Sequence, residues 1–260
     1  MTCSLVKSQQ VFSASLCLVL LLGTLWPQAL EAAELTVSAA ISLKEAFTEI
    51  ATQFKKDHPN DQVLFNFAAS GELAQQIEQG APVDVFASAA PKQIQTLDKK
   101  GLLLGSSQLF AHNRLVVVVP KGEAKVISFE QLAKVKLLGI GNPKTVPVGQ
   151  YAVEALTKAG IYQALLDEKK FVYAENVRQV LTYVESGNVD AGIVYATDAR
   201  TSEKATIGFP VPANYSEPIV YPIAVLKGSK QPDLAKAFVA FVLSAQGQTI
   251  LQNKGFLRAK

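Results

Sequence analysis

Short apolar runs alternate with amphipathic segments along most of this chain, and that pattern is typical of a layered α/β protein. Apolar runs rich in β-branched residues predict strands at 34–38, 62–68, 83–88, 114–119, 137–141, 191–195 and 219–226. Apolar residues spaced three and four apart predict helices between them, at 42–54, 73–79, 92–100, 150–159, 177–185 and 232–246.

Residues that favour helix ends support several of these boundaries. Ser42 and Glu45 have the spacing of a capping box, in which each side chain bonds the other residue's main-chain N–H. Pro91 and Gly101 stand at the two ends of another predicted helix, where proline and glycine are favoured. Asn176 is a suitable N-cap for the helix that follows it.

The order of the predicted elements indicates two lobes. Two β-rich runs, 115–119 and 219–226, flank a middle segment that has strands and helices of its own. A chain that leaves one lobe, builds a second and returns needs two such crossings. We therefore expect lobe 1 at 34–113 together with 220–260, and lobe 2 at 114–219.

The beginning of the chain has a different pattern. Lys7 precedes an uncharged stretch at 11–26, and small residues follow it. The apolar run is shorter than the roughly 20 residues of a membrane-spanning helix, so a cleaved signal peptide over 1–33 is favoured over an uncleaved anchor. We expect a periplasmic protein that has no cysteine once the signal is removed, because Cys3 and Cys17 both lie in it.

Composition and charge narrow the function classes. The chain of 260 residues is 49% hydrophobic and 18% charged, as in globular proteins with a sizeable core. Its 25 Lys and Arg residues against 22 Asp and Glu residues leave a net charge of only +3. Proteins that bind nucleic acids normally carry a stronger basic surface, so we expect no nucleic-acid partner.

Residues that could support catalysis are few. His58 and His112 are not at metal-ligand spacing, and both are expected at the surface. Asp84 could act as a general base, but no second carboxylate is tied to it by spacing. The glycines at 139–141 begin like a dinucleotide loop but indicate a turn more strongly, because the third glycine is missing. We expect no catalytic residue, no cofactor and no enzyme activity.

Several predicted turns share a design suited to anions. Small uncharged residues connect a strand to a helix at 39–42, 68–71, 87–91 and 146–149, with a more polar version at 174–177. The first N–H groups of a helix have no partner within it and carry a partial positive charge. Any one of these turns alone is explained by ordinary helix capping, but several together favour a site for an oxyanion.

Five ordered motifs, at 38–43, 67–71, 80–86, 141–143 with 146–151, and 191–198, make the chain resemble the periplasmic molybdate-binding proteins of molybdate ABC transporters. The resemblance covers essentially all of residues 34–260. It implies a type II periplasmic-binding-protein fold, with a mixed β-sheet flanked by helices in each lobe and a two-strand hinge. It also implies a monomer that closes over molybdate, or the nearly isosteric tungstate, and delivers it to a membrane permease.

The same resemblance implies which residues contact the ligand. Hydroxyl and main-chain N–H donors fall on Ser42 and Ser70, and a phenol donor falls on Tyr195. Further main-chain donors fall on Ala89, Val148 and Val177. Ile41 and Val148 depart from the alanines usual in the family, which bears on selectivity among oxyanions. The molybdenum would be contacted only through its oxygens, without a separate metal site.

Three other interpretations remain open at this stage. The chain could be a receptor for another tetrahedral oxyanion such as sulfate. It could be an exported hydrolase of phosphate or sulfate esters, which also needs an anion cradle but requires a nucleophile beside a base. A ligand-sensing module of a gene regulator is disfavoured by the export signal.

Overall fold

The computed structural model describes residues 1–2, 33–123 and 126–259. The signal peptide predicted over 1–33 lies outside the described residues, apart from residues 1–2 and 33. The strands are β1 (Glu34–Ala40), β2 (Gln62–Ala68), β3 (Val85–Ala87), β4 (Gln108–His112), β5 (Leu115–Pro120), β6 (Leu138–Gly141), β7 (Phe171–Ala174), β8 (Ala191–Tyr195), β9 (Ala205–Pro210), β10 (Val220–Val225) and β11 (Leu257–Arg258). The α-helices are α1 (Lys44–Asp57), α2 (Ser70–Glu78), α3 (Pro91–Lys99), α4 (Phe129–Leu132), α5 (Pro147–Lys158), α6 (Tyr162–Asp167), α7 (Val177–Glu185), α8 (Ala196–Ala199), α9 (Pro232–Leu243) and α10 (Ala245–Asn253), with 3₁₀ turns η1 (Ile41–Leu43) and η2 (Ala213–Tyr215).

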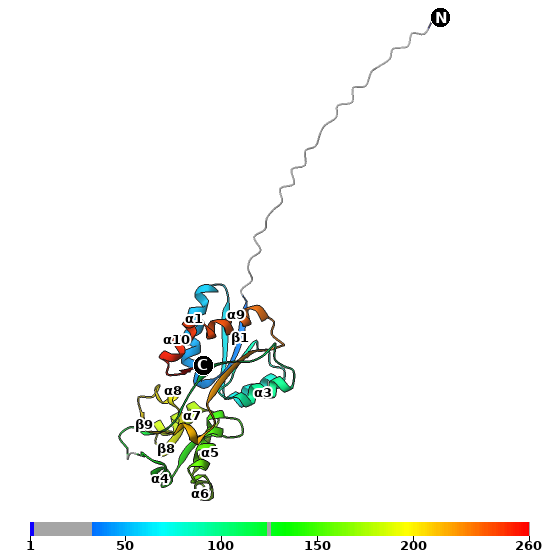
Figure 1. Ribbon diagram of the computed structural model, residues 1–260. Coiled ribbons are helices and arrows are strands. Elements are labelled where there is room, and N and C mark those ends of the chain that lie inside the picture. Colours follow the sequence, from blue (N-terminus) through cyan, green and yellow to red (C-terminus); the bar gives the residue numbers. More distant parts are fainter. Residues whose placement is uncertain (3–32, 124–125, 260) are drawn as a thin grey trace. The chain divides into compact units, whose positions relative to one another are not determined.

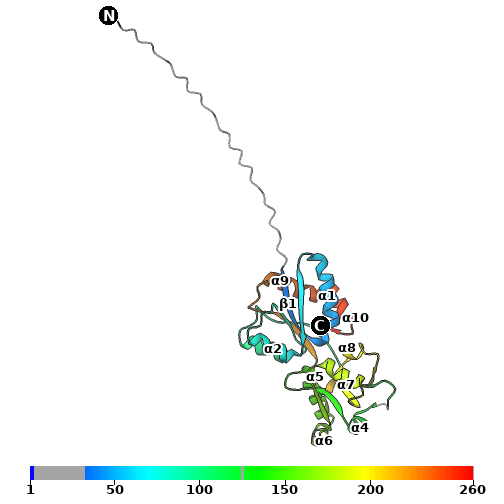
Figure 2. The same cartoon turned by 180° about the vertical axis from the view of Figure 1, so that it is seen from behind.

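The first sheet has six strands in the order β11-β4-β10-β3-β1-β2. β1 pairs in parallel with β2 and β3, whereas β10 runs antiparallel to β3 and β4. Successive side chains of a strand face opposite sides of its sheet, and in β3 Val85 and Ala87 join one core cluster while Phe86 joins the other. α1, α9 and α10 lie together beside this sheet (Figures 1 and 2). α2 and α3 pack on each other around the smaller cluster.

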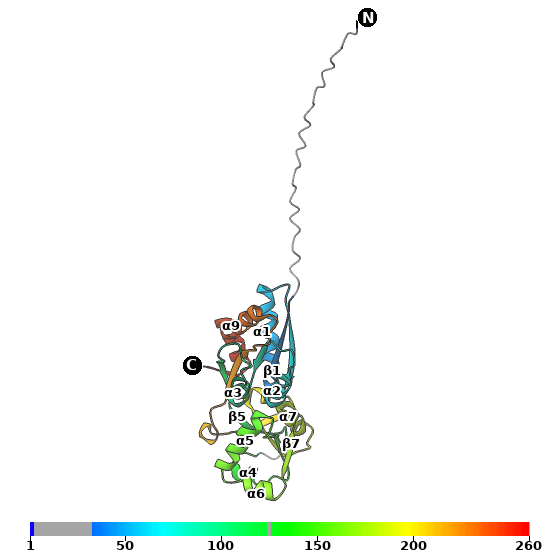
Figure 3. The same ribbon diagram turned by 90° about the vertical axis from the view of Figure 1, so that its right-hand side faces the viewer.

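The second sheet has five strands in the order β7-β6-β8-β5-β9. β6 pairs in parallel with β7 and β8, and β5 runs antiparallel to β8 and β9. α5 and α7 pack on β6 and β8, within the group of helices around this sheet (Figure 3). Two mixed sheets, each flanked by helices, confirm the predicted α/β class.

The chain passes between the two sheets twice. It leaves β4 and enters β5 through Asn113 and Arg114, and it returns from β9 to β10 through residues 211–219. Asn113 is buried, with 7% of its surface exposed. The first crossing therefore passes through the interior of the protein.

Several sequence predictions are corrected. The helix predicted over 232–246 is two helices, because Ser244 ends α9 and caps α10 by accepting a hydrogen bond from Gly247 N–H at 3.2 Å. The helix predicted to begin at Ser42 opens instead with η1, and α1 has no side-chain cap, so the capping box is wrong. The cap at Asn176 is confirmed, since its Oδ1 accepts from Gln179 N–H at 3.0 Å.

Within the described ranges, no single helix has the length and apolar composition needed to cross a membrane. The pair α9 and α10, bent by 60° at the break, meets that test only when its two helices are taken together.

Candidate functional site

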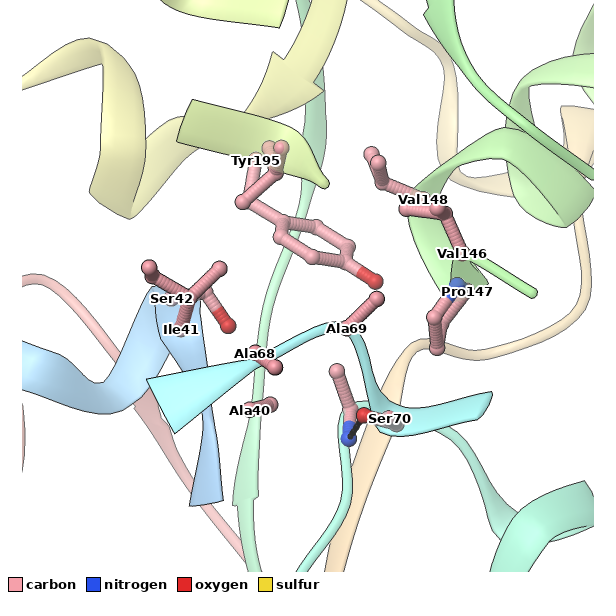
Figure 4. Close-up of a pocket in the computed structure, with 12 residues that line it drawn as sticks. Ala40, Ile41, Ser42, Ala68, Ala69, Ser70, Val146, Pro147, Val148 and Tyr195 are labelled. Atoms are coloured by element: carbon pink, nitrogen blue, oxygen red, sulfur yellow. Dashed lines mark hydrogen bonds between the residues drawn. The ribbon is translucent and has the colours of Figure 1, made fainter. Parts of the chain in front are cut away.

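The six residues expected to contact an oxyanion line one pocket. Ser42, Ser70 and Ala89 reach it from the first sheet and its connections, and Val148, Val177 and Tyr195 reach it from the second. Ser42, Ser70, Val148 and Tyr195 are labelled among the lining side chains in Figure 4. The remaining lining residues are Ala40, Ile41, Ala68, Ala69, Val146 and Pro147. All twelve side chains are uncharged.

Ser70 begins α2 and is completely buried. Its Oγ accepts a hydrogen bond from Ala89 N–H at 3.0 Å, so the hydroxyl hydrogen stays available for another acceptor. Ala69, the residue before it, offers no side-chain cap, so the first N–H groups of α2 have no partner inside the helix. Ser70 contributes a hydroxyl donor at the positive end of a helix.

Gly71 brings α2, beside the first sheet, into direct contact with the loop that follows β6 of the second sheet. Its N–H donates to the carbonyl oxygen of Thr145, in the loop between β6 and α5, at 3.0 Å. A Cβ on Gly71 would lie 2.3 Å from that oxygen. The absence of a side chain is thus what allows this approach.

α5 presents the main-chain N–H of Val148. Pro147 is the first helical residue, a position that proline favours because its ring fixes the backbone there. Gly149 lets the helix approach β6 closely, since a Cβ on Gly149 would lie 2.0 Å from the carbonyl oxygen of Gly141. Gly141 in turn leaves room for the side chains of Val146 and Val148, whose Cγ1 atoms would lie 2.5 Å and 3.2 Å from a Cβ at Gly141.

α7 presents the N–H of Val177 in a similar way. The Asn176 side chain accepts from Gln179 N–H. This cap does not use the N–H of Val177, the first helical residue. The pocket therefore receives the N-terminal ends of α2, α5 and α7 together. Helix N-termini favour negative charge, and three of them at one pocket reinforce this preference.

Tyr195 ends β8 and is 2% exposed. Its hydroxyl is buried and has no hydrogen-bond partner among the described residues, and in Figure 4 it points into the space between the lining residues. Burial is the largest cause that holds the pKa of Tyr195 well above its usual range, so the phenol keeps its proton. A buried hydroxyl without a partner costs free energy, which a bound hydrogen-bond acceptor would recover.

Ser42 lies in η1 and is 4% exposed. Its Oγ lies 3.1 Å from the hydroxyl oxygen of Tyr221, and Asn113 Nδ2 donates to the same phenol oxygen at 3.1 Å. The sequence-based reasoning missed both Tyr221 and Asn113. The sequence around Tyr221 predicts only a buried strand, and nothing in it distinguishes this tyrosine from the apolar residues on either side.

One cationic and two acidic side chains meet close to the pocket in a network of ion pairs. Arg178, which follows Val177, contacts Glu45 of α1 at 2.5 Å and Asp198 of α8 at 2.6 Å. Asp198 is completely buried, and burial raises its pKa to about 6 although Arg178 opposes the shift. The Arg178–Glu45 pair joins the two sheets across the cleft, and the sequence-based reasoning did not identify it.

Other candidate groups have structural roles. Asp84 accepts hydrogen bonds from Thr36 N–H at 2.8 Å, Ser229 Oγ at 2.6 Å and Lys230 N–H at 3.1 Å, so its carboxylate ties three segments of the chain together. Residues 139–141 belong to β6 rather than to a turn. In the ranges that the structure covers, no cluster of three or more His, Cys, Asp or Glu residues is arranged to hold a metal ion.

The pocket can hold a small oxyanion through hydrogen bonds alone. Its available groups are N–H and O–H donors from both sheets, with helix N-termini behind three of them. Uncharged donors bring no second charge that must lose its water on binding. An anion enclosed here would be bound by dispersed dipoles.

Comparison with known proteins agrees with this geometry. Residues 35–257 match the family of bacterial extracellular solute-binding proteins. The molybdate-binding protein ModA of Mycobacterium tuberculosis (strain H37Rv) is 41% identical over 230 residues, covering 87% of this chain and 85% of its own length. ModA of Escherichia coli K12 is 37% identical, covering 86% and 88%. The solved structure of the Azotobacter vinelandii periplasmic molybdate-binding protein, 27% identical, superposes with a TM-score of 0.79 over 87% of this chain and 100% of its own.

Proposed function

The chain belongs to the family of bacterial extracellular solute-binding proteins, and we propose that it binds molybdate in the periplasm and delivers it to an ABC permease for import. The export signal predicted over 1–33 supports the periplasmic location. The relatives that share 37% and 41% of its residues are molybdate-binding proteins, which supports the choice of ligand. The protein would act as a monomer, without nucleic acid, cofactor or catalysis.

The observation that carries the proposal is the buried, unpartnered hydroxyl of Tyr195 in a pocket of uncharged donors. In the proposed complex Tyr195 donates to one molybdate oxygen. Ser42 and Ser70 donate through their hydroxyls and main-chain N–H groups, and Val148 and Val177 donate through N–H groups at helix N-termini. The N–H of Ala89 is bonded to Ser70 Oγ, so Ala89 supports the site through that serine.

Lobe closure completes this site in the proposed cycle. Lobe 1, residues 34–113 with 220–260, contributes the serines, and lobe 2, residues 114–219, contributes Val148, Val177 and Tyr195. Neither lobe alone surrounds a tetrahedral ion. The open protein would capture molybdate, and closure would bring donors from both lobes onto it.

A site made of donors also selects among oxyanions. Molybdate carries no proton near neutral pH, whereas hydrogen phosphate carries one that would face donors, and each mismatched polar group costs about 1 to 3 kcal/mol. Sulfate has no proton but shorter bonds, so its oxygens would stretch contacts set for a larger ion. Tungstate is nearly isosteric with molybdate and should bind equally well.

Isothermal titration calorimetry of the mature protein against molybdate, tungstate, sulfate and phosphate tests the proposal. We expect tight binding of the first two ions and weak or no binding of the others. Sulfate binding as tight as molybdate binding would instead identify a receptor for a different oxyanion.

Catalysis is the remaining alternative, and the site argues against it. Ser42 Oγ contacts a phenol and Ser70 Oγ contacts a main-chain N–H, so neither serine has a base within hydrogen-bond distance among the described residues. Turnover of a chromogenic phosphate or sulfate ester that is lost in Ser42→Ala would overturn this part of the proposal.

A further inference from the structure

A buried series of side chains connects the pocket to the crossing between the two sheets. Asn113 Nδ2 lies 3.1 Å from Tyr221 Oη, which lies 3.1 Å from Ser42 Oγ. The exposed fractions of Asn113, Tyr221 and Ser42 are 7%, 0% and 4%. Asn113 Nδ2 also donates to Thr197 Oγ1 of α8 at 2.9 Å, so both of its hydrogens are used.

The direction of each hydrogen bond in this series follows from its chemistry. Arg114 N–H donates to Asn113 Oδ1 at 2.9 Å, which fixes the amide so that Nδ2 faces Tyr221. An amide nitrogen only donates, so Tyr221 Oη accepts from it. Burial holds the pKa of Tyr221 far above its usual range, so this phenol keeps its hydrogen. Ser42 Oγ is the one acceptor within hydrogen-bond distance of that hydrogen among the described residues.

The opposite direction would be unfavourable. If Ser42 donated to Tyr221, the phenol oxygen would accept two hydrogen bonds, and its own buried hydrogen would have no acceptor among the described residues. A buried donor without an acceptor costs more than an ordinary hydrogen bond contributes. Tyr221 therefore donates, and Ser42 accepts.

Because Ser42 Oγ accepts from Tyr221, its own hydrogen is left for the pocket that Ser42 lines. We propose that Asn113 and Tyr221 are positioning residues that fix Ser42 as a hydrogen-bond donor to the bound oxyanion. This inference rests on the proposed function, because it assumes that an anion is bound. It adds a specificity role for residues outside the pocket. Because Ser42 presents its hydroxyl hydrogen to the pocket, a ligand that also presents a hydrogen at this position would bind less well.

A double-mutant cycle tests the inference. Molybdate affinity is measured by calorimetry for wild type, Ser42→Ala, Tyr221→Phe and the double variant. Each single change should raise Kd about tenfold, as expected for one hydrogen bond to a charged group. If Tyr221 acts through Ser42, the double variant should also lose only about tenfold, whereas independent effects would multiply to about a hundredfold.

Controls separate positioning from general damage. Tyr162→Phe, in α6, makes the same chemical change away from the pocket and should leave Kd unchanged. Ligand-free thermal unfolding reports any loss of stability in Tyr221→Phe. A Tyr221→Phe variant with wild-type affinity, or losses that multiply in the double variant, would overturn the inference. Absence of molybdate binding by the wild type would overturn the proposed function and this inference with it.

Asn113→Asp provides a second test because it keeps the shape of the side chain but reverses the series. An aspartate oxygen would accept from Tyr221, Tyr221 would accept from Ser42, and Ser42 would then present a lone pair to the anion. We expect Asn113→Asp to lower the affinity for molybdate about a hundredfold. The same substitution made in the Ser42→Ala variant measures the part of this loss that is due to the new negative charge. If Asn113→Asp costs as much in that background as in the wild type, the inference is wrong.

Discussion

Replacing Gly71 by alanine should separate ligand binding from stability. In the structure a Cβ at this position would lie 2.3 Å from the carbonyl oxygen of Thr145, and real Cβ contacts essentially never fall below 3.0 Å. The two sheets would therefore have to separate by at least 3.0 − 2.3 = 0.7 Å at this point. Both colliding groups belong to the backbone, so no side-chain rotation can relieve the contact.

The cost can be worked out from the bonds that such a separation breaks. The Gly71–Thr145 hydrogen bond contributes about 1 kcal/mol. A separation of 0.7 Å would also lengthen bonds from the ligand to donors on one lobe beyond the hydrogen-bond range, and losing one or two such bonds costs about 2 to 3 kcal/mol more. The sum of about 3 to 4 kcal/mol corresponds to a rise of about 100- to 1,000-fold in Kd for molybdate.

In the proposed cycle the lobes of the unliganded protein are apart, so its stability should not suffer from the same change. Gly71 lies in the first turn of α2 and has no positive φ, and alanine is favoured over glycine in a helix by up to about 1 kcal/mol. Calorimetry would give Kd, and urea unfolding without ligand would give the free energy of unfolding. Gly228→Ala is the matched control, because a Cβ there meets nothing within 4 Å. A Gly71→Ala variant that binds molybdate within threefold of wild type would refute the reasoning.

Three further predictions concern the pocket and its charged neighbours. Ser70→Ala should weaken the binding free energy of molybdate by about 1 to 3 kcal/mol, because a hydrogen bond to the anion is lost. Val148→Ala should change the affinity little, because Val148 offers its main-chain N–H. Calorimetry of the two variants side by side checks both expectations. Glu45→Gln should raise Kd by no more than about fivefold, because the Arg178–Glu45 pair is partly exposed, and the effect should shrink in high salt; an effect that grows with salt would contradict a bridging role. The pKa of Asp198 is raised from 3.8 to about 6 in the folded protein, so the folded state binds the extra proton and this residue's contribution to stability falls as pH rises from about 4 to 6. The unfolding temperature of the ligand-free wild type should therefore fall relative to that of Asp198→Asn as the pH rises across that range. A constant difference between the two unfolding temperatures would show that the pKa is not raised.

Strands that are buried along their whole length were predictable from the sequence, and so was β2 at one edge of the first sheet, whereas β4, β7 and β9 were not. β3 and β8 are buried along their whole length and appear as plain apolar runs. β7 and β9 lie at the two edges of the second sheet and alternate irregularly between exposed and half-buried residues, so neither shows a clear period. A strand with one unpaired edge can carry polar side chains, and these interrupt the apolar pattern from which a strand is predicted.

The pocket shows the same division between local and distant information. The turns at 39–42, 68–71 and 146–149 were recognisable because small residues before a helix are a local pattern, and the family resemblance then placed Ser42, Ser70 and Val148 in them. The contacts that orient these groups join residues far apart in the chain. Ser42 and Tyr221 are separated by 179 positions, and Glu45 and Arg178 by 133. No periodicity connects such residues, so only the folded structure reveals them.

The uncharged lining also determines how the ion can leave. The attraction between an ion and a dipole weakens with distance more steeply than the attraction between two ions, and hydrogen bonds fail within about an ångström of stretching. Once a transporter draws the lobes apart, little residual force would keep a dianion attached to either half. Tight binding in the closed form and rapid release in the open form would then have one cause: the side chains that line the pocket are all uncharged.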